Sequence, residues 1–229
     1  MKQIYWKHTQ MPKKILKIHK KEESVSILIG RIPYSKDYDL NAIDLMASKV
    51  DNKGLICLSI PIHVEAPTNF IKLIAHLESK YNVVSLISWH RDRHIVTTKS
   101  KRLTNAWEPL LILSKSPSWH LDRDTPSKPK KGAAGREEQF DEDEFLTCIG
   151  DHWPVRFDRR DRRLLPAQIV LNLIQLGGIS SGDTVLDPWG NPSIKEQCEA
   201  FGMTYCDGGL ESPIRKEFKK SKKEEENDI

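Results

Sequence analysis

Segments with the pattern of buried strands alternate with segments patterned like amphipathic helices along most of this chain. Apolar, β-branched runs of strand length cover residues 24–30, 55–62, 83–89 and 109–115, which predicts buried strands. Apolar side chains recur at helical spacing over residues 39–51 and 69–81. Residues 51–54, Asp-Asn-Lys-Gly, are typical of a turn. This alternation predicts an α/β fold with a mainly parallel, doubly wound sheet.

A second α/β segment follows a stretch of different character. Residues 116–152 are rich in Pro, Gly, Ser and charge, which predicts a mobile insert. Beyond it, residues 164–178 have a helical pattern with Pro166 in the first turn and glycines at the end. A strand, a short helix over 193–202, a weak strand over 203–209 and a closing helix over 212–220 are expected next. We therefore predict a single domain over residues 1–229 that contains this insert.

Composition narrows the class of protein. No apolar run approaches the ~18 residues that a membrane span needs, and the first 20 residues lack the apolar core of a secretory signal. The four cysteines are scattered without a Cys-x-x-Cys pair, which favours a reduced intracellular protein without structural zinc. We expect it in the cytoplasm or nucleoid, or in the nucleus of a eukaryote. The net charge of +4 is mild, but the basic residues are clustered.

Four stretches, in this order, carry a resemblance to a known family. They are "IPYSKDYD" (32–39), "KVDNKGLICLSI" (49–60), "ISWHRDRHIVTTKSKRLTNAWEPLLILSKS" (87–116), and the segment from "HWPVRF" (152–157) to "TVLDPWG" (184–190). The chain resembles the permuted, β-class DNA amino-methyltransferases, which act on N6 of adenine or N4 of cytosine. The resemblance covers residues 24–218. It implies a Rossmann-like, S-adenosylmethionine-dependent methyltransferase fold, circularly permuted, with the catalytic half first and the cofactor half last.

The resemblance places Pro33 and Tyr34 in the family's catalytic Asp-Pro-Pro-Tyr motif, with Arg31 in the position of the acceptor. In the family, an Asp, Asn or Ser oxygen and a backbone carbonyl accept the two hydrogens of the target amine, and the aromatic residue stacks on the flipped base. A guanidinium has five donors and no acceptor. We therefore predict a remnant motif that can stack a base without activating it. An alignment displaced by one or two residues is the alternative.

The resemblance also implies cofactor contacts, and the sequence departs from the family there. A Gly-rich loop is expected after the strand, where bare backbone approaches the methyl donor. Pro192 stands near the second glycine's place and lacks an N–H. Asp207 and Glu211, candidates for the acid that binds the ribose, are both judged out of register. S-adenosylmethionine is thus a possible but weakened cofactor. Its expected contacts are Asp187, Pro188, Trp189, Gly190 and Pro166.

Two basic clusters flank the DNA-facing cleft of the resembled family, where arginine and lysine would neutralise phosphates. Their members are Arg91, Arg93, Lys99, Lys101 and Arg102, and Arg156, Arg159, Arg160, Arg162 and Arg163. The alternative for the second cluster is a solvated network in which Asp158 and Asp161 pair with the arginines. No metal site is predicted, because His90 and His94 have no carboxylate or cysteine partner.

These observations favour a DNA-binding protein with a methyltransferase fold that has lost catalysis. Such a protein could bind double-stranded DNA as a homodimer, or as the partner of an active methyltransferase. Two alternatives remain open, namely an active DNA amino-methyltransferase with an unusual motif and a binder of S-adenosylmethionine or another nucleotide that has lost the DNA role.

Overall fold

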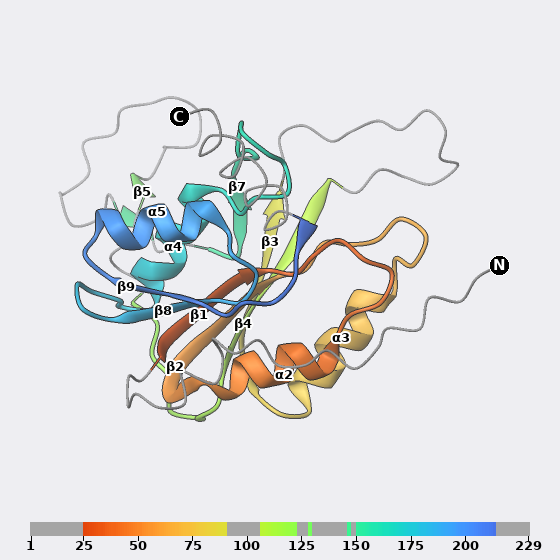
Figure 1. Cartoon of the computed structure of the whole chain (residues 1–229), viewed down its shortest axis with the longest axis horizontal. Coiled ribbons are helices and arrows are strands. Elements are labelled where there is room, and N and C mark those ends of the chain that lie inside the picture. Colours follow the sequence, from red (N-terminus) through yellow and green to blue (C-terminus); the bar gives the residue numbers. More distant parts are fainter. Residues whose placement is uncertain (1–24, 91–105, 123–127, 130–145, 148–149, 214–229) are drawn as a thin grey trace, which may run out of the picture.

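A computed structural model describes residues 25–90, 106–122, 128–129, 146–147 and 150–213 (Figure 1). In this part of the chain, seven strands form one sheet in the order β7-β3-β4-β2-β1-β8-β9. Their bounds are Val25–Arg31 (β1), Val50–Ser59 (β2), Asn82–His90 (β3), Trp107–Ser114 (β4), His152–Pro154 (β7), Thr184–Asp187 (β8) and Thr204–Asp207 (β9). Lys128–Pro129 (β5) and Leu146–Thr147 (β6) pair as a separate two-stranded sheet.

The large sheet is mainly parallel, as predicted. Neighbouring strands run in the same direction in four of the six pairs, and only β4 is reversed, against both β2 and β3. The carboxyl ends of β1 and β8 therefore lie at the same edge of the sheet, where ligands bind in open α/β sheets. The α/β class with a mainly parallel sheet is confirmed, whereas the circular permutation stays a prediction.

Helices cover both faces of this sheet. Leu40–Ser48 (α2) and Asn69–Glu78 (α3) lie on one face, and Ala167–Leu176 (α4) and Pro192–Ala200 (α5) lie on the other (Figure 1). Alternate side chains of β1 point to opposite faces. Ile27 and Ile29 accordingly pack with α4 and α5, while Leu28 packs with α2 and α3. None of the described helices is long and apolar enough to cross a membrane.

Capping side chains start two of the described helices, α2 and α5. Asp39 caps α2 by accepting from the Ala42 N–H at 3.0 Å, which satisfies one of the free amides of the first turn. Asn191 caps α5 in the same way for Ser193. Pro166 is the N-cap of α4, one position before the first turn in which it was expected.

The turn expected over residues 51–54 is wrong, because β2 runs through them without a break. Gly54 explains how a turn-like sequence stays in a strand. A Cβ at this position would lie 2.6 Å from the Ser26 carbonyl oxygen and 2.6 Å from Val50 Cγ1. The glycine therefore permits a close approach of β2 to β1 beside the irregularity in their pairing.

Substituting Gly54→Ala is expected to destabilise the protein by about 1–3 kcal/mol, because backbone must move to admit the methyl group. Urea denaturation measures the change. Gly150→Ala is the matched control, since a Cβ there meets nothing within 4 Å. Equal stability of the two variants would contradict this reading of Gly54.

The expected insert over 116–152 is described only in part. Leu121 packs against the α4 side of the core, and the Asp122 N–H donates to the Leu176 carbonyl at 2.8 Å. Residues 123–127, 130–145 and 148–149 lie outside the described residues, as does most of the expected closing helix over 212–220. The predictions of a mobile insert, of a single domain and of a closing helix therefore stay predictions.

Candidate functional site

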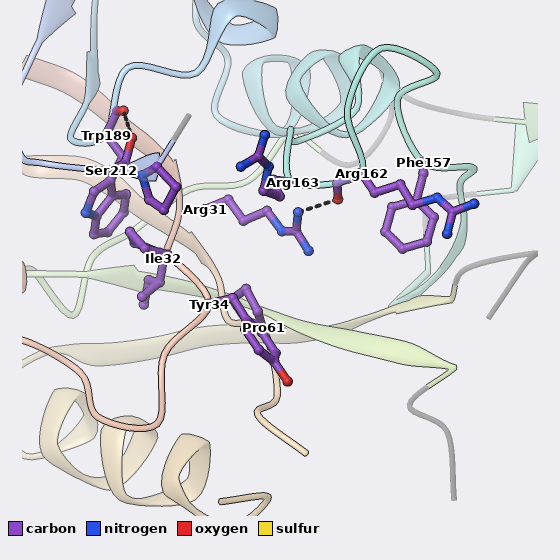
Figure 2. A pocket seen from close by; sticks show the side chains of 11 residues that line it. Arg31, Ile32, Tyr34, Pro61, Phe157, Arg162, Arg163, Trp189 and Ser212 are labelled. Atoms are coloured by element: carbon purple, nitrogen blue, oxygen red, sulfur yellow. Dashed lines mark hydrogen bonds between the residues drawn. The ribbon is translucent and has the colours of Figure 1, made fainter. Parts of the chain in front are cut away.

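The carboxyl ends of β1 and β8 border a cavity of about 200 Å³ (Figure 2). It brings together the two segments that the sequence analysis singled out, because Pro33 and Tyr34 line it from the β1 side and Trp189 lines it from the β8 side. Its walls are largely apolar. The remaining lining residues are Arg31, Ile32, Pro61, Phe157, Arg162, Arg163, Ser212 and Pro213.

Arg31, the last residue of β1, is held by three groups. Its Nε and Nη2 donate to the two oxygens of Glu108 at 2.7 and 2.6 Å. Its Nη1 donates to the Arg162 carbonyl at 2.7 Å (Figure 2). The guanidinium carbon also lies 5.4 Å from the centre of the Trp89 ring, within cation–π range. The side chain is 9% exposed. Arg31 is therefore a fixed cation whose donors point into the protein.

Glu108 is the counterion, and the sequence analysis missed it. Its side chain is fully buried in β4, and Ser59 donates a further hydrogen bond to its Oε1. A buried carboxylate is tolerated when it is paired and hydrogen-bonded in this way. The available signal was a glutamate inside the apolar segment "WEPLLILS".

Side-chain oxygens that could accept from a target amine are few around this cavity. Among its described lining residues they belong to Tyr34 and Ser212. The Tyr34 hydroxyl accepts from the Val64 N–H at 3.2 Å, and the Ser212 hydroxyl donates to the Trp189 carbonyl at 2.9 Å. The Ser35 hydroxyl accepts from the Asp37 N–H and does not line the cavity. The position expected to supply an acceptor presents a donor.

Tyr34 supplies the expected aromatic ring, but another side chain of the protein already stacks on it. Its ring stacks on His63 with centroids 4.6 Å apart and an angle of 28° between planes. The side chain is 54% exposed. One face of the predicted stacking residue is thus occupied by a side chain of the same protein.

On the β8 side, Asp187 organises the loop that follows it. Its carboxylate accepts from the backbone N–H groups of Trp189 and Gly190, each at 3.0 Å, and from that of Asn191. The Tyr205 hydroxyl donates to it at 2.9 Å. Asp187 is buried, and this burial outweighs the four hydrogen bonds and raises its pKa to about 6. The loop amides that could face a donor molecule point at Asp187.

Of the five expected cofactor contacts, only Trp189 lines the cavity. Its ring lies against Gly30, where a Cβ would come within 2.7 Å of Trp189 Cζ3. Pro188 packs beside it, Gly190 adopts a positive φ of 73°, and Pro166 caps α4. Pro192 is the first residue of α5, a position whose N–H would have no partner inside the helix. That proline therefore costs the helix no hydrogen bond.

The judgement that Asp207 is out of register with the family's ribose-binding acid is wrong. Asp207 is the last residue of β9 and pairs in register with Asp187 at the end of β8. A carboxylate at the end of the strand next to the donor loop is where nucleotide-binding sheets hold ribose hydroxyls. The pairing of Asp207 with Asp187 was not visible in the sequence, because it depends on how β8 and β9 align in the sheet.

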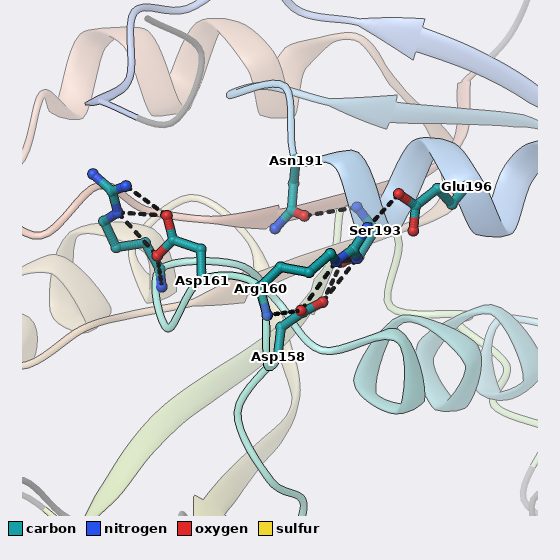
Figure 3. Close-up of polar contacts among 7 residues, drawn as sticks. Asp158, Arg160, Asp161, Asn191, Ser193 and Glu196 are labelled. Atoms are coloured by element: carbon teal, nitrogen blue, oxygen red, sulfur yellow. Dashed lines mark hydrogen bonds and ion pairs between the residues drawn. The ribbon is translucent and has the colours of Figure 1, made fainter. Parts of the chain in front are cut away.

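The arginine-rich segment 156–163 lies within the described residues, and its arginines differ in their contacts. Arg160 pairs with Asp158 and Glu196, at 2.8 and 2.5 Å, and Arg163 pairs with Asp161 at 2.5 Å (Figure 3). This is the internal network that the alternative reading anticipated. All five arginines are exposed. Residues 91–105, with Arg91, Arg93, Lys99, Lys101 and Arg102, lie outside the described residues.

Metal-binding groups are not found in the described part of the chain, where no three His, Cys, Asp or Glu side chains gather suitably. His90 and His152 lie at the ends of β3 and β7 with ring centroids 5.7 Å apart. His94 lies outside the described residues.

Comparison with known proteins decides the family. A family model described as DNA methylase matches residues 8–190. The chain belongs to the DNA methylase family. A search of curated protein sequences gave no match.

Solved structures agree with the DNA methylase assignment at the level of fold. M1.HpyAVI in complex with S-adenosylmethionine is 18% identical with a TM-score of 0.59, over 92% of this chain and 93% of that one. TTHA0409 of Thermus thermophilus, complexed with S-adenosyl-L-methionine, is 14% identical with a TM-score of 0.53, over 85% and 84% of the two chains. The methyltransferase-like fold inferred from the sequence is therefore confirmed.

Proposed function

We propose that this chain is a non-catalytic DNA methylase homologue that binds double-stranded DNA and serves as a partner subunit of an active methyltransferase. The observation that supports the loss of catalysis is the fixed Arg31 guanidinium at the end of β1. Both Glu108 oxygens and the Arg162 carbonyl hold it there. Rotation of the Arg31 side chain would not place an acceptor there, because a guanidinium has none.

Amine methylation requires oxygen acceptors at that point. The lone pair of an exocyclic amine is delocalised into the base, and it becomes nucleophilic only when its two hydrogens are accepted by neighbouring oxygens. A guanidinium offers donors alone and stays charged at any physiological pH. It would also repel the positive sulfonium of a methyl donor. Arg31 thus opposes the reaction at both the acceptor and the donor.

The donor side fits S-adenosylmethionine better than the acceptor side fits catalysis. Asp207 would hold the ribose hydroxyls, and Trp189 would pack against the donor from the cavity wall. When bound, this molecule supplies a methyl group on a cationic sulfur. The placement of Asp207 specifically favours the second candidate function, an S-adenosylmethionine binder or an active amino-methyltransferase.

A methyl-transfer assay with labelled donor and mixed duplex DNA tests the proposal. We expect the natural protein to give background incorporation. The variant to compare is Arg31→Asp with Glu108→Gln, which supplies the family's acceptor without placing two buried carboxylates together. It is expected to rise above background, and Glu108→Gln alone is the control. Transfer by the natural protein that Tyr34→Ala abolishes would contradict the proposal and establish the active alternative.

Three binding measurements separate the remaining parts of the proposal. Calorimetry with S-adenosylmethionine reports on the donor side, and a gel shift on duplex DNA at low and moderate salt reports on DNA. Sedimentation velocity with an active methylase reports on the partner role. DNA binding together with association, but without transfer, is the expected pattern.

A further inference from the structure

The segment 158–163 is a tandem repeat of Asp-Arg-Arg, and the structure repeats with it. In the first unit the Arg160 N–H donates to Asp158 Oδ1 at 2.9 Å, and in the second the Arg163 N–H donates to Asp161 Oδ1 at 2.8 Å. Each aspartate thus closes a turn onto the residue two positions ahead. Each also binds the guanidinium of that same residue. The two units are equivalent in both backbone and side-chain contacts.

Contacts to neighbouring elements fasten both units, the first to α5 (Figure 3) and the second to β1 (Figure 2). Arg160 donates to Glu196 Oε1 at 2.5 Å and to Ser193 Oγ at 3.0 Å, which attaches the first unit to the first turns of α5. Ser193 in turn donates to Asp158 at 3.1 Å. The second unit is attached to β1, because the Arg162 carbonyl accepts from Arg31 at 2.7 Å. This backbone is therefore held at two points.

The first arginine of each unit differs from the second. Arg159 and Arg162 are exposed, and no hydrogen bond or ion pair among the described residues engages either side chain. The hydrogen bonds from Arg160 and Arg163 lower the pKa of Asp158 and of Asp161. Both aspartates are therefore ionised at neutral pH. Four arginines and two aspartates leave a net charge of +2 on the segment. That charge resides on the two outward arginines.

We propose that Arg159 and Arg162 contact two phosphates of a DNA backbone, and that Arg160 and Arg163 position them by fixing the loop. This rests on the proposed DNA-binding function and deepens it. Arginine is suited to the role because its planar fork binds phosphate with two hydrogen bonds. Arg162 also lines the cavity, so the second unit lies beside the candidate site. Four of the five arginines expected to act alike thus have two different roles.

The test is fluorescence anisotropy of the full chain with a 20-base-pair duplex between 50 and 300 mM NaCl. Each lost phosphate contact lowers the slope of log K against log salt by about 0.9. Arg159→Gln with Arg162→Gln is expected to reduce the slope by about 1.8 and to weaken binding roughly 60-fold at 0.1 M salt. Arg159→Lys with Arg162→Lys is expected to keep most of the slope, since lysine retains the charge.

The charge-matched control is Lys53→Gln with Lys72→Gln. Lys53 is an exposed residue near the start of β2, at the opposite edge of the sheet, and Lys72 is exposed on α3. A wild-type slope near zero would overturn the DNA-binding function itself. A normal wild-type slope with equal reductions in the two Gln pairs would overturn only the assignment to Arg159 and Arg162. Competition by polyglutamate as strong as by DNA would overturn it in favour of an acidic protein partner.

Discussion

Replacing Arg31 with methionine is expected to lower the free energy of unfolding by about 3–5 kcal/mol. Methionine retains most of the side chain's apolar volume but leaves Glu108 ionised, without its counterion, in a fully buried position. Breaking a buried pair from one side has costs of this size, because the remaining charge is uncompensated. Chemical denaturation at pH 7 measures the change.

The double variant Arg31→Met with Glu108→Gln is expected to recover most of that loss. The amide is neutral, and its oxygen can still accept from the Ser59 hydroxyl. A buried ion pair replaced by neutral groups of similar volume is often no less stable than the original. If both variants lost the same stability, the cost would arise from packing around Trp89 and not from the charge on Glu108.

The second large effect is a dependence of stability on pH through Asp187. Burial raises its pKa from an ordinary 3.8 to about 6, so the folded protein holds this proton more tightly than the unfolded chain. The stabilising contribution is complete below pH 4 and is lost as pH rises through 6. At 1.36 kcal/mol per unit, the full loss is about 3 kcal/mol, and most of it falls between pH 4 and pH 7.

Asp187→Asn isolates this contribution. The amide cannot accept all four hydrogen bonds, so we expect a less stable protein whose stability lacks this decline between pH 4 and 7. Asp44, Asp158, Asp161 and Asp183 have lowered pKa values. Their stabilisation is lost only as pH falls below about 4. All groups other than residue 187 are common to the two proteins and cancel in the difference. The same slope in the variant would disprove the role of Asp187.

Local patterns were enough to place most strands and helices. The run "SVSILIG" gave β1 because β-branched and apolar residues fill a strand buried on both faces. Gly54 was misread because its turn-like neighbours are local, whereas the approach of β1 that demands a glycine is not. The residues next to Gly54 in the sequence do not indicate a contact that it makes with a neighbouring strand.

The residues of the candidate site were predictable from the sequence, but their hydrogen-bond and ion-pair partners were not. The absence of an acceptor at Arg31 follows from the residue type alone. Its partner Glu108 lies 77 positions away in sequence, and only the sheet brings the two together. Asp187 was expected to face a cofactor, yet its oxygens bind the loop that follows it. Which way a carboxylate turns depends on where backbone amides gather, and that is a property of the folded loop.

The coupling of Arg31 to Glu108 constrains how such a protein could change over time. A descendant with an acidic residue at position 31 that kept Glu108 would place two carboxylates together inside the sheet. A descendant that first lost Glu108 would leave the buried Arg31 cation beside Trp89 without its counterion. Either order passes through a poorly folding intermediate, so placing a carboxylate at position 31 would require two nearly simultaneous substitutions. The ion pair thus makes the arginine at position 31 difficult to exchange for an acidic residue.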